Sequence, residues 1–334
     1  MEEIALVTGA NGFIGSHLVN ALVAEGRKVR CLIQPGTRTG YLPIGVEQVA
    51  GDILDSRKLR SVLKGTSTVY HLAAQIRPHA QFATLRSLRS HYYDINVKGT
   101  VKLLEAARLA GAHKFIHCST IAASGISGGV SEDSKGVPVA EYGRSKKLAE
   151  EEALAFGRRG YFLVSVLRLG QVFGPRNIPM LPLFRCFKRG ILPLVGCGMN
   201  SMPVCYVENV SRAFILAEEK IKSAEVYFIA DCHCSMEEFG REASAVLGIC
   251  LRRVNIPVGL CRTLLRTKGF LETISGICWS PWRRDVSSDL AQVIGKDWEC
   301  NNGKATKELG FSPSVGLREG IRRTTLWYWR QGLL

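Results

Sequence analysis

A glycine-spaced turn near the amino terminus constrains the fold of this chain more than any other feature of its sequence. The stretch LVTGANGFIGSHL, residues 6–18, follows the start of an apolar run, and apolar residues at helical spacing follow Gly12. Strand, glycine turn and helix in this order favour a dinucleotide site over a merely structural turn, because a helix start offers free N–H groups to a pyrophosphate. The candidate contacts are Gly9, Asn11, Gly12, Phe13, Ile14 and Gly15.

Strand and helix patterns alternate over the first two thirds of the chain. Apolar runs predict strands at 4–8, 28–34, 46–50, 67–72, 113–119 and 161–168. Helical patterns lie between them, at 13–25, 56–64, 93–110 and 142–158. We therefore expect an α/β fold of Rossmann type, a doubly wound parallel sheet that binds its ligands at the carboxyl ends of the strands.

The alternation loosens after residue 170. The segment VFGPRNIPMLPLF carries three prolines and cannot form one helix. A strand-to-helix pattern then resumes, EVYFIA at 225–230 predicts another strand, and the remaining residues are predicted to be mainly helical. We expect a dinucleotide-binding domain at 1–170 to which 204–230 returns, and a smaller, mostly helical C-terminal substrate-binding cap from 171–203 and 231–334.

The end of the second predicted strand bears on the choice between NAD and NADP. An acidic residue there selects NAD by binding the ribose 2′-hydroxyl, whereas a nearby arginine accepts the 2′-phosphate of NADP. This chain has Gln34 in place of an acid and Arg38 four residues later. The pattern favours NADP slightly, although a neutral residue accommodates either cofactor.

A tyrosine and a lysine on one face of a predicted helix are the candidate catalytic pair. Tyr142 and Lys146 lie four residues apart in EYGRSKKLAEEEAL. A phenol is a poor base at neutral pH, but a nearby ammonium group lowers its pKa. Such a tyrosine can exchange a proton with a substrate alcohol or carbonyl as hydride passes to or from a nicotinamide. Upstream, the hydroxyls of Ser119 and Thr120 either hydrogen-bond the reacting oxygen or merely cap a strand end.

Together with the G-x-x-G-x-x-G spacing, these motifs resemble the extended short-chain dehydrogenase/reductase superfamily, in its NAD-dependent epimerase/dehydratase-like family. The resemblance runs from residue 4 to about residue 330. It implies that Thr120, five residues before Gly125, is the catalytic hydroxyl, and that Lys146 also contacts the nicotinamide ribose. Ser124 stands where sugar epimerases often have tyrosine. The other implied residues are Asn96 in DINVKGT, which supports the active site, and the cofactor neighbours Asp52, Ile53, Leu72, Ala73, Ala74, Leu169 and Val172.

The motifs say less about the substrate. Many nucleotide-sugar epimerases carry an Arg–Asp pair where this chain has Met202 and Pro203. The basic residues that could replace this arginine are Arg176, Arg185, Lys188, Arg189 and Arg284. Ile121 and Ala122 follow Thr120 in place of the Asp–Glu pair of sugar 4,6-dehydratases, so dehydratase chemistry is disfavoured.

Three functions are open on this sequence. We expect an NAD(P)-dependent oxidoreductase or epimerase that acts on a nucleotide-sugar or related sugar by tyrosine-assisted hydride transfer. The alternative is an NADP-dependent ketone/alcohol oxidoreductase, similar to hydroxysteroid dehydrogenases or dihydroflavonol reductases, which Met202, Pro203 and Gln34 favour. A non-catalytic nucleotide sensor is disfavoured, because such proteins usually lack the Tyr–Lys pair.

Composition and charge bear on partners and location. The net charge is +15, but the basic residues are spread from Arg27 to Arg330, which indicates a solvated surface and an anionic ligand and no nucleic acid. Eleven cysteines form no repeated C-x-x-C pair, and DCHC at 231–234 has no second Cys/His pair, so we expect no metal. No apolar run reaches about 18 residues, and two glutamates among the first three residues disfavour a signal peptide.

These features lead us to expect a cytoplasmic protein with no transmembrane span, which binds a small-molecule substrate and forms a homodimer. The apolar, arginine-interspersed region 254–284 allows a substrate lid, peripheral membrane contact or an ordinary cap helix.

Overall fold

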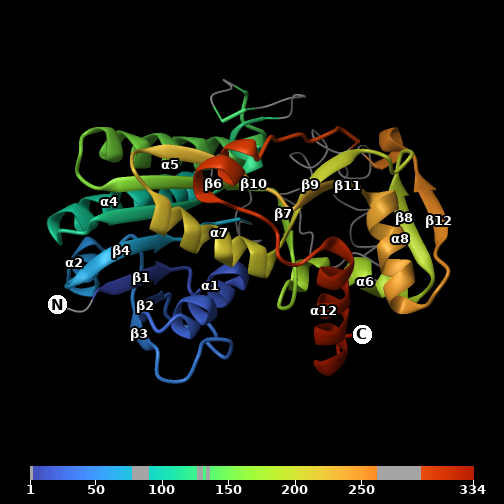
Figure 1. Ribbon diagram of the computed structural model, residues 1–334, viewed down its shortest axis with the longest axis horizontal. Coiled ribbons are helices and arrows are strands. Elements are labelled where there is room, and N and C mark those ends of the chain that lie inside the picture. Colours follow the sequence, from blue (N-terminus) through green and yellow to red (C-terminus); the bar gives the residue numbers. More distant parts are fainter. Residues whose placement is uncertain (1–2, 77–89, 126–130, 133–135, 262–294) are drawn as a thin grey trace.

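A parallel sheet of seven strands forms the centre of the larger of two lobes (Figure 1). The computed structural model describes residues 3–76, 90–125, 131–132, 136–261 and 295–334. The strands run in the order β10-β6-β5-β4-β1-β2-β3. Their bounds are β1 (Ile4–Thr8), β2 (Lys28–Ile33), β3 (Glu47–Ala50), β4 (Thr66–His71), β5 (Lys114–Thr120), β6 (Leu163–Leu169) and β10 (Glu225–Ile229). The predicted Rossmann-type fold is confirmed, and each of the six strands predicted before residue 170 lies within two residues of its expected position.

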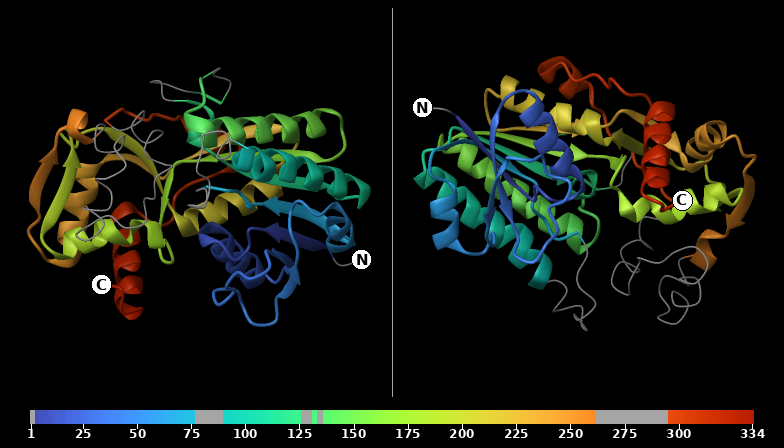
Figure 2. Two further views of the ribbon diagram at one scale, coloured as in Figure 1. Left: turned by 180° about the vertical axis from the view of Figure 1, so that it is seen from behind. Right: turned by 90° about the horizontal axis from the view of Figure 1, so that it is seen from below.

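Helices cover both faces of this sheet (Figures 1 and 2). The helices on one face are α1 (Phe13–Ala24) and α7 (Val207–Lys220), and those on the other are α2 (Ser56–Val62), α4 (Gly99–Leu109) and α5 (Ala140–Arg158). Each face buries its own apolar core, because strands of a parallel sheet are apolar on both sides. The helix predicted at 93–110 is divided into a π-helical segment, η1 (Tyr93–Lys98), followed by α4.

The smaller lobe carries two short sheets around a third apolar core. One sheet has the order β11-β9-β7 and the other pairs β12 with β8. The strands are β7 (Gln171–Phe173), β8 (Ile191–Val195), β9 (Ser201–Tyr206), β11 (Cys232–Ser235) and β12 (Arg252–Ile256). The helical elements there are η3 (Ile178–Met180), α6 (Leu181–Lys188), α8 (Met236–Leu247) and α12 (Leu317–Arg330). In the larger lobe, η2 (Ile121–Ala123) follows β5, and η4 (Ala305–Leu309) packs against β10 and α7.

The strand-to-helix pattern of VCYVENVSRAFILAEE, at 204–219, falls on the end of β9 and on α7, but the other short strands of the smaller lobe were not predicted. Two strands of this lobe contain proline, Pro193 in β8 and Pro203 in β9, and proline argues against a strand because it cannot donate to a ladder. In the structure, Pro203 lies just outside the β7 ladder, which begins at Val204 of β9. The prediction of a mainly helical segment after residue 231 likewise missed β11 and β12.

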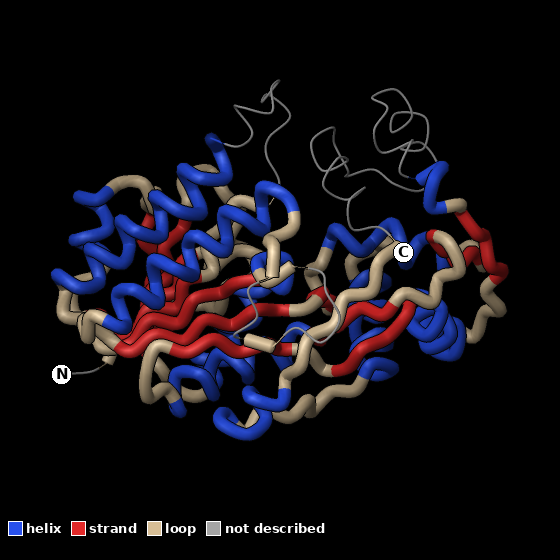
Figure 3. Tube along the Cα trace, turned by 90° about the horizontal axis from the view of Figure 1, so that it is seen from above, coloured by secondary structure: helices blue, strands red, loops and turns tan. Residues whose placement is uncertain are grey.

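The chain passes from the smaller lobe to the larger one before α7 and returns after β10, because β9 and β11 pair in the smaller lobe while β10 joins the large sheet. Asn209 at the start of α7 donates from Nδ2 to Asp231 Oδ2 (2.8 Å), just after β10, and to the carbonyl of Val315 (2.9 Å). The large-sheet strands run toward the smaller lobe, so their carboxyl ends face it (Figure 3). Within the described ranges, no helix is long and apolar enough to cross a membrane.

Candidate functional site

The glycine turn between β1 and α1 packs too tightly for side chains at two of its three glycines. Gly9 has φ +67°, and a Cβ there would lie 2.7 Å from the backbone nitrogen of Ala73. A Cβ at Gly15 would overlap the carbonyl oxygen of Gly9. These two glycines therefore let α1 and the end of β4 close on the turn, which places Leu72 and Ala73 beside it.

Gly12 is less crowded, because among the described residues a Cβ there would come close to Gly9 O, at 3.1 Å, without overlapping it. It is exposed and provides the N-cap of α1 without a capping side chain. No N-cap side chain therefore bonds the N–H groups in the first turn of α1, and the backbone at Gly12 is exposed beside them. Phe13 and Ile14 follow and are half-buried. This cradle fits the pyrophosphate of a dinucleotide.

The loop after β2 folds back onto the same turn. Asn11 donates from Nδ2 to Thr37 Oγ1 (2.8 Å) and to the backbone carbonyl of Arg38 (3.1 Å). Gln34 and Arg38 are both exposed. Their position next to Asn11 fits the place where the adenosine ribose of a dinucleotide would lie.

Asp52 and Ile53 follow β3 at the same edge of the sheet. Asp52 Oδ1 accepts a hydrogen bond from Leu54 N (2.8 Å), which orders the turn into α2. Ile53 is buried and packs against Gly99 at the start of α4, where a Cβ would come within 3.2 Å of it.

A close approach between α5 and the turn after β5 assembles the candidate catalytic residues. A Cβ on Gly143 would overlap the carbonyl oxygen of Ala122, so only glycine allows this packing. Tyr142 precedes Gly143, and Thr120 ends β5 two residues before Ala122, where its Oγ1 accepts from Ala122 N (3.3 Å). Tyr142 and Thr120 are both half-buried. Gly143 was not predicted from the sequence as a site residue, although a glycine inside a helical pattern often marks a close packing contact.

Asn96 connects the end of β4 to α5. Its Oδ1 accepts from Gln75 N (2.7 Å), and its Nδ2 donates to Gln75 O (3.1 Å) and to Ser145 Oγ (2.9 Å). Ser145 in turn donates to the carbonyl of Tyr142 (2.8 Å). Asn96 therefore links the end of β4 to α5, and its support of an active site stays a prediction. Ser145 is a partner that was not predicted from the sequence.

Lys146 is buried, and its ammonium group lies by a histidine. Its Nζ is 3.3 Å from Nε2 of His117 on β5. Burial raises the pKa of the Tyr142 phenol, and the nearby Cys118 and Tyr92 raise it further, while burial lowers the pKa of Lys146. The direction of the Tyr142 pKa shift is thus opposite to the lowering that a nearby Lys146 was expected to cause.

Ser119 and Thr120, neighbours on β5, point to opposite faces of the sheet, because side chains alternate along a strand. Ser119 Oγ donates to Glu150 Oε1 of α5 (2.5 Å), and the same carboxylate receives Arg168 Nη2 at 2.8 Å. All three side chains are buried. Ser124 is also buried and donates to the carbonyl of Ile121 (2.8 Å).

Leu169 and Val172 lie where β6 passes into β7. Leu169 pairs with Thr120 in the sheet register, so its backbone is adjacent to the end of β5. Both side chains are buried, at 4% and 9% exposure, and the amide of the intervening Gly170 donates to Ile229 O (3.0 Å). The structure thus brings Leu169 beside the candidate catalytic hydroxyl.

Two of the basic residues considered for a substrate diphosphate, Arg176 and Arg185, contact other parts of the chain. Arg176 donates to Ser16 Oγ of α1 (3.1 Å) and stacks on the Tyr41 ring, 5.0 Å from its centroid. Arg185 donates to the carbonyl of Leu333 (3.2 Å). Met202 is half-buried and Pro203 buried, so neither supplies a cation. Lys188 and Arg189 are exposed, and Arg284 lies outside the described residues.

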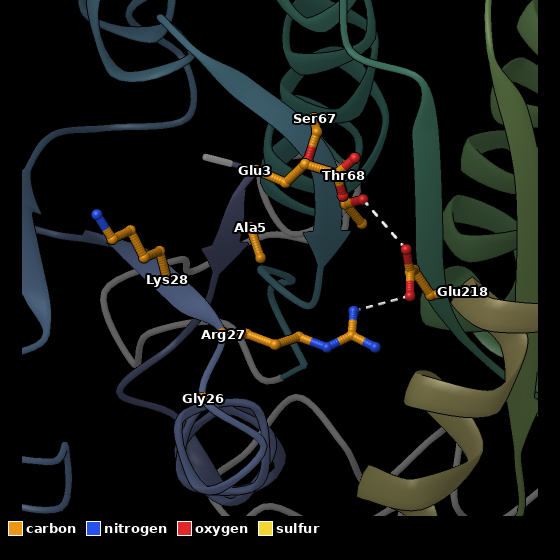
Figure 4. A pocket seen from close by; sticks show the side chains of 8 residues that line it. All are labelled: Glu3, Ala5, Gly26, Arg27, Lys28, Ser67, Thr68 and Glu218. Atoms are coloured by element: carbon orange, nitrogen blue, oxygen red, sulfur yellow. Dashed lines mark hydrogen bonds and ion pairs between the residues drawn. The ribbon is translucent and has the colours of Figure 1, made fainter. Parts of the chain in front are cut away.

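A cavity of about 450 Å³ opens at the opposite edge of the large sheet, where β1, β2 and β4 begin (Figure 4). One lining residue is Glu218, whose carboxylate accepts hydrogen bonds from Arg27 Nη1 (2.8 Å), Lys114 Nζ (2.7 Å) and Thr68 Oγ1 (3.5 Å). Because two cations already neutralise this carboxylate, and because the cavity is remote from Tyr142, we assign it no part in the chemistry.

The DCHC stretch comprises Asp231 and the first three residues of β11. His233 Nε2 accepts from the backbone nitrogen of Cys300 (3.3 Å). In the part of the chain that the structure describes, no three His, Cys, Asp or Glu side chains are grouped to hold a metal ion.

Comparison with known proteins places this geometry in a family. The sterol demethylase protein B of Methylococcus capsulatus is 28% identical over 343 residues, covering 98% of this chain and 99% of that protein. A putative dihydroflavonol 4-reductase of Synechocystis is 25% identical, with 99% and 96% covered. The crystal structure of UDP-glucose 4-epimerase with UDP-glucose from Thermotoga maritima matches with TM-score 0.78 and 26% identity, covering 99% of this chain and 100% of that one.

The model of the NAD dependent epimerase/dehydratase family matches residues 5–230, from the first strand through α7 to the end of β10. This span includes the glycine turn, Thr120, Tyr142 and Lys146. The chain therefore belongs to the NAD dependent epimerase/dehydratase family.

Proposed function

We propose that this protein catalyses NAD(P)-dependent hydride transfer to or from a substrate carbon that bears a carbonyl or hydroxyl group. One observation carries the proposal: the Gly143–Ala122 contact holds Tyr142 next to the strand end where Thr120 lies. This junction is at the carboxyl edge of the sheet, as is the glycine turn that fits a dinucleotide.

Each candidate residue has a separate task in this proposal. The Thr120 hydroxyl hydrogen-bonds the substrate oxygen, and Tyr142 gives that oxygen a proton in reduction or removes one in oxidation. Lys146 contacts the nicotinamide ribose and offsets the cost of a phenolate at Tyr142. Asn96 and Ser145 fix the position of the catalytic helix. The nicotinamide, when bound, supplies or accepts the hydride.

For the substrate, we rank a less polar ketone or alcohol ahead of a nucleotide sugar. Met202 and Pro203 provide no cation for a diphosphate, and Arg176 and Arg185 contact other parts of the chain. The names of two relatives, a sterol demethylase protein and a dihydroflavonol reductase, also point to less polar substrates. The nucleotide sugar is the second candidate, favoured by the likeness to the UDP-glucose 4-epimerase structure.

A panel of ligands separates the two substrate classes. The purified protein with NADPH or NAD⁺ would be heated with UDP-sugars, hydroxysteroids and dihydroflavonols, because a specific ligand raises the melting temperature. Each stabilising ligand would then be tested for a change in NAD(P)H absorbance. Stabilisation by a UDP-sugar alone would reverse our ranking. If neither cofactor nor any ligand class stabilised the protein, the proposed function would be wrong.

We further propose a slight preference for NADP, supported by the exposed Arg38 whose backbone is held next to the glycine turn. A homodimer and a cytoplasmic location stay predictions from the sequence. Light scattering after gel filtration measures the first, and cell fractionation measures the second.

A further inference from the structure

The buried Lys146 side chain contacts His117, a histidine with no part in the proposed proton and hydride transfer. The Lys146 side chain comes from α5 and His117 from β5, and their exposures are 2% and 0%. The 3.3 Å separation of Nζ and Nε2 is within hydrogen-bonding range for this pair. A buried ammonium group needs an acceptor, because the alternative is a desolvated and unpaired charge.

A second histidine shows how protons are arranged around this contact. His71 on β4 is adjacent to His117 in the sheet, with ring centroids 5.2 Å apart. The Thr100 hydroxyl donates to Asn96 O (2.6 Å), so it must accept from His71 Nε2 at 2.8 Å. His71 Nδ1, 2.8 Å from Thr8 Oγ1, is then the acceptor nitrogen. Both nitrogens of His71 are thus satisfied with a single ring proton, in the neutral form.

His117 is also neutral. Burial lowers its pKa well below the usual value, and the adjacent Lys146 and His71 lower it further. A neutral imidazole has one acceptor nitrogen, and the nitrogen that faces an ammonium group must be that acceptor. The proton of His117 then sits on Nδ1, which has no hydrogen-bond partner among the described residues.

We propose that His117 is a positioning residue that holds the Lys146 ammonium group through Nε2, so that this lysine stays charged and correctly placed for the cofactor ribose and Tyr142. The inference rests on the proposed function, since it concerns a residue of that site. His71 supports the arrangement by keeping a neutral ring beside His117. The other groups near Lys146 are Cys118 of β5 and Glu150 of α5, both of which favour its charged form.

The test compares two replacements of His117. His117→Gln places an amide oxygen near the former Nε2, and His117→Met has similar length but no comparable acceptor. NADPH affinity would be measured by fluorescence titration from pH 6.5 to 10, with circular dichroism to verify folding at each pH. A Lys146→Met variant identifies the part of the pH profile that this lysine causes.

The expected result is a shift in the alkaline decline of NADPH affinity. Loss of the acceptor disfavours the ammonium form, so His117→Met should move the decline about one pH unit lower, as expected for one hydrogen bond to a charged group. It should also weaken NADPH binding at pH 8 about tenfold. His117→Gln should restore most of both, which a purely structural role of His117 would not produce.

Three outcomes are distinguishable. If the unaltered protein does not bind NADPH or NADH at all, the proposed function fails. If it binds, and folded His117→Met keeps the same affinity and the same alkaline decline, the positioning role is overturned. If His117→Met does not fold, His117→Asn replaces it, because its shorter amide cannot reach Lys146 as that of glutamine does.

Discussion

Ser119 donates a hydrogen bond to the buried Glu150 at 2.5 Å, on the face of the sheet that α5 covers, opposite to the face of its neighbour Thr120. The two hydroxyls stand together in the sequence, and both were candidates for catalysis. Glu150 also carries the buried Arg168, so Ser119 belongs to an ion-pair network inside the larger lobe. We therefore propose different roles for the two residues.

Ser119→Ala is expected to cost stability and to spare turnover. Glu150 would lose one of its buried donors, which costs about 1–3 kcal/mol in the free energy of unfolding. Urea unfolding measures this loss, and turnover is measured with the substrate found in the ligand panel. Thr120→Val should give the opposite result, near-normal stability with turnover lost, and Thr120→Ser should stay active. A Ser119→Ala protein that is stable but inactive would return Ser119 to the catalytic candidates.

Tyr142→Phe should reduce turnover by about 10²–10⁴-fold, the usual contribution of a general acid–base group. The ring and its packing against Tyr92, with centroids 6.1 Å apart, would be retained. Cofactor binding should survive, as a fluorescence titration with NADPH can verify. Turnover at the parent rate would show that Tyr142 does not transfer the proton.

Gly12→Val should abolish NAD(P) binding in a folded protein. A Cβ at residue 12 would lie 3.1 Å from Gly9 O, a close contact without the overlap that Gly15 would suffer, so the valine would project into the space where the pyrophosphate fits. Calorimetry measures the affinity. Gly15→Ala is the matched control: it should impair folding itself, because its Cβ would overlap Gly9 O. Unchanged affinity in a folded Gly12→Val variant would place the cofactor elsewhere.

Arg38→Ala should weaken NADPH binding more than NADH binding, because the exposed guanidinium is the candidate partner of the 2′-phosphate. A charge-assisted hydrogen bond of this kind contributes about 1.5–3 kcal/mol, or roughly tenfold or more in affinity. Parallel titrations of both cofactors decide the matter. Tighter binding of NADH than NADPH in the unaltered protein, with no effect of Arg38→Ala, would assign the chain to NAD.

His17 should make the protein sensitive to acid. Burial lowers its pKa from 6.5 to about 4, with the nearby Arg176 adding to the effect and the hydrogen bond to Pro175 O opposing it. Between these values the unfolded chain binds a proton that the folded chain does not. The free energy of unfolding should therefore keep its full His17 contribution above about pH 6.5 and lose about 3 kcal/mol as the pH drops toward 4.

The control for this acid sensitivity is His17→Gln. Glutamine keeps a donor for Pro175 O, which lies 3.0 Å from His17 Nε2, but it does not titrate. The loss of stability between pH 6.5 and 4 should therefore be smaller in the variant. Equal urea midpoints for both proteins across this range would show that His17 is not the responsible group.

Local sequence patterns determined the alternation of strands and helices that builds the large sheet. Buried strands, the glycine turn and the spacing of Tyr142 and Lys146 are all properties of short segments, because strand burial, helix periodicity and glycine geometry depend on neighbouring residues. The fold class and the family follow from these segments, and the structure and the family model confirm both.

Only the tertiary structure decided which side chains meet. Three contacts join residues from different elements: Ser119 with Glu150, Lys146 with His117, and Arg176 with Ser16 of α1. The first of them gives Ser119 a different environment from its neighbour Thr120. The proline-containing strands β8 and β9 likewise form because partner strands and a shared apolar core stabilise them against the low propensity of their own residues. Burial also reversed the expected shift of the Tyr142 pKa, because desolvation depends on all the elements packed around a side chain.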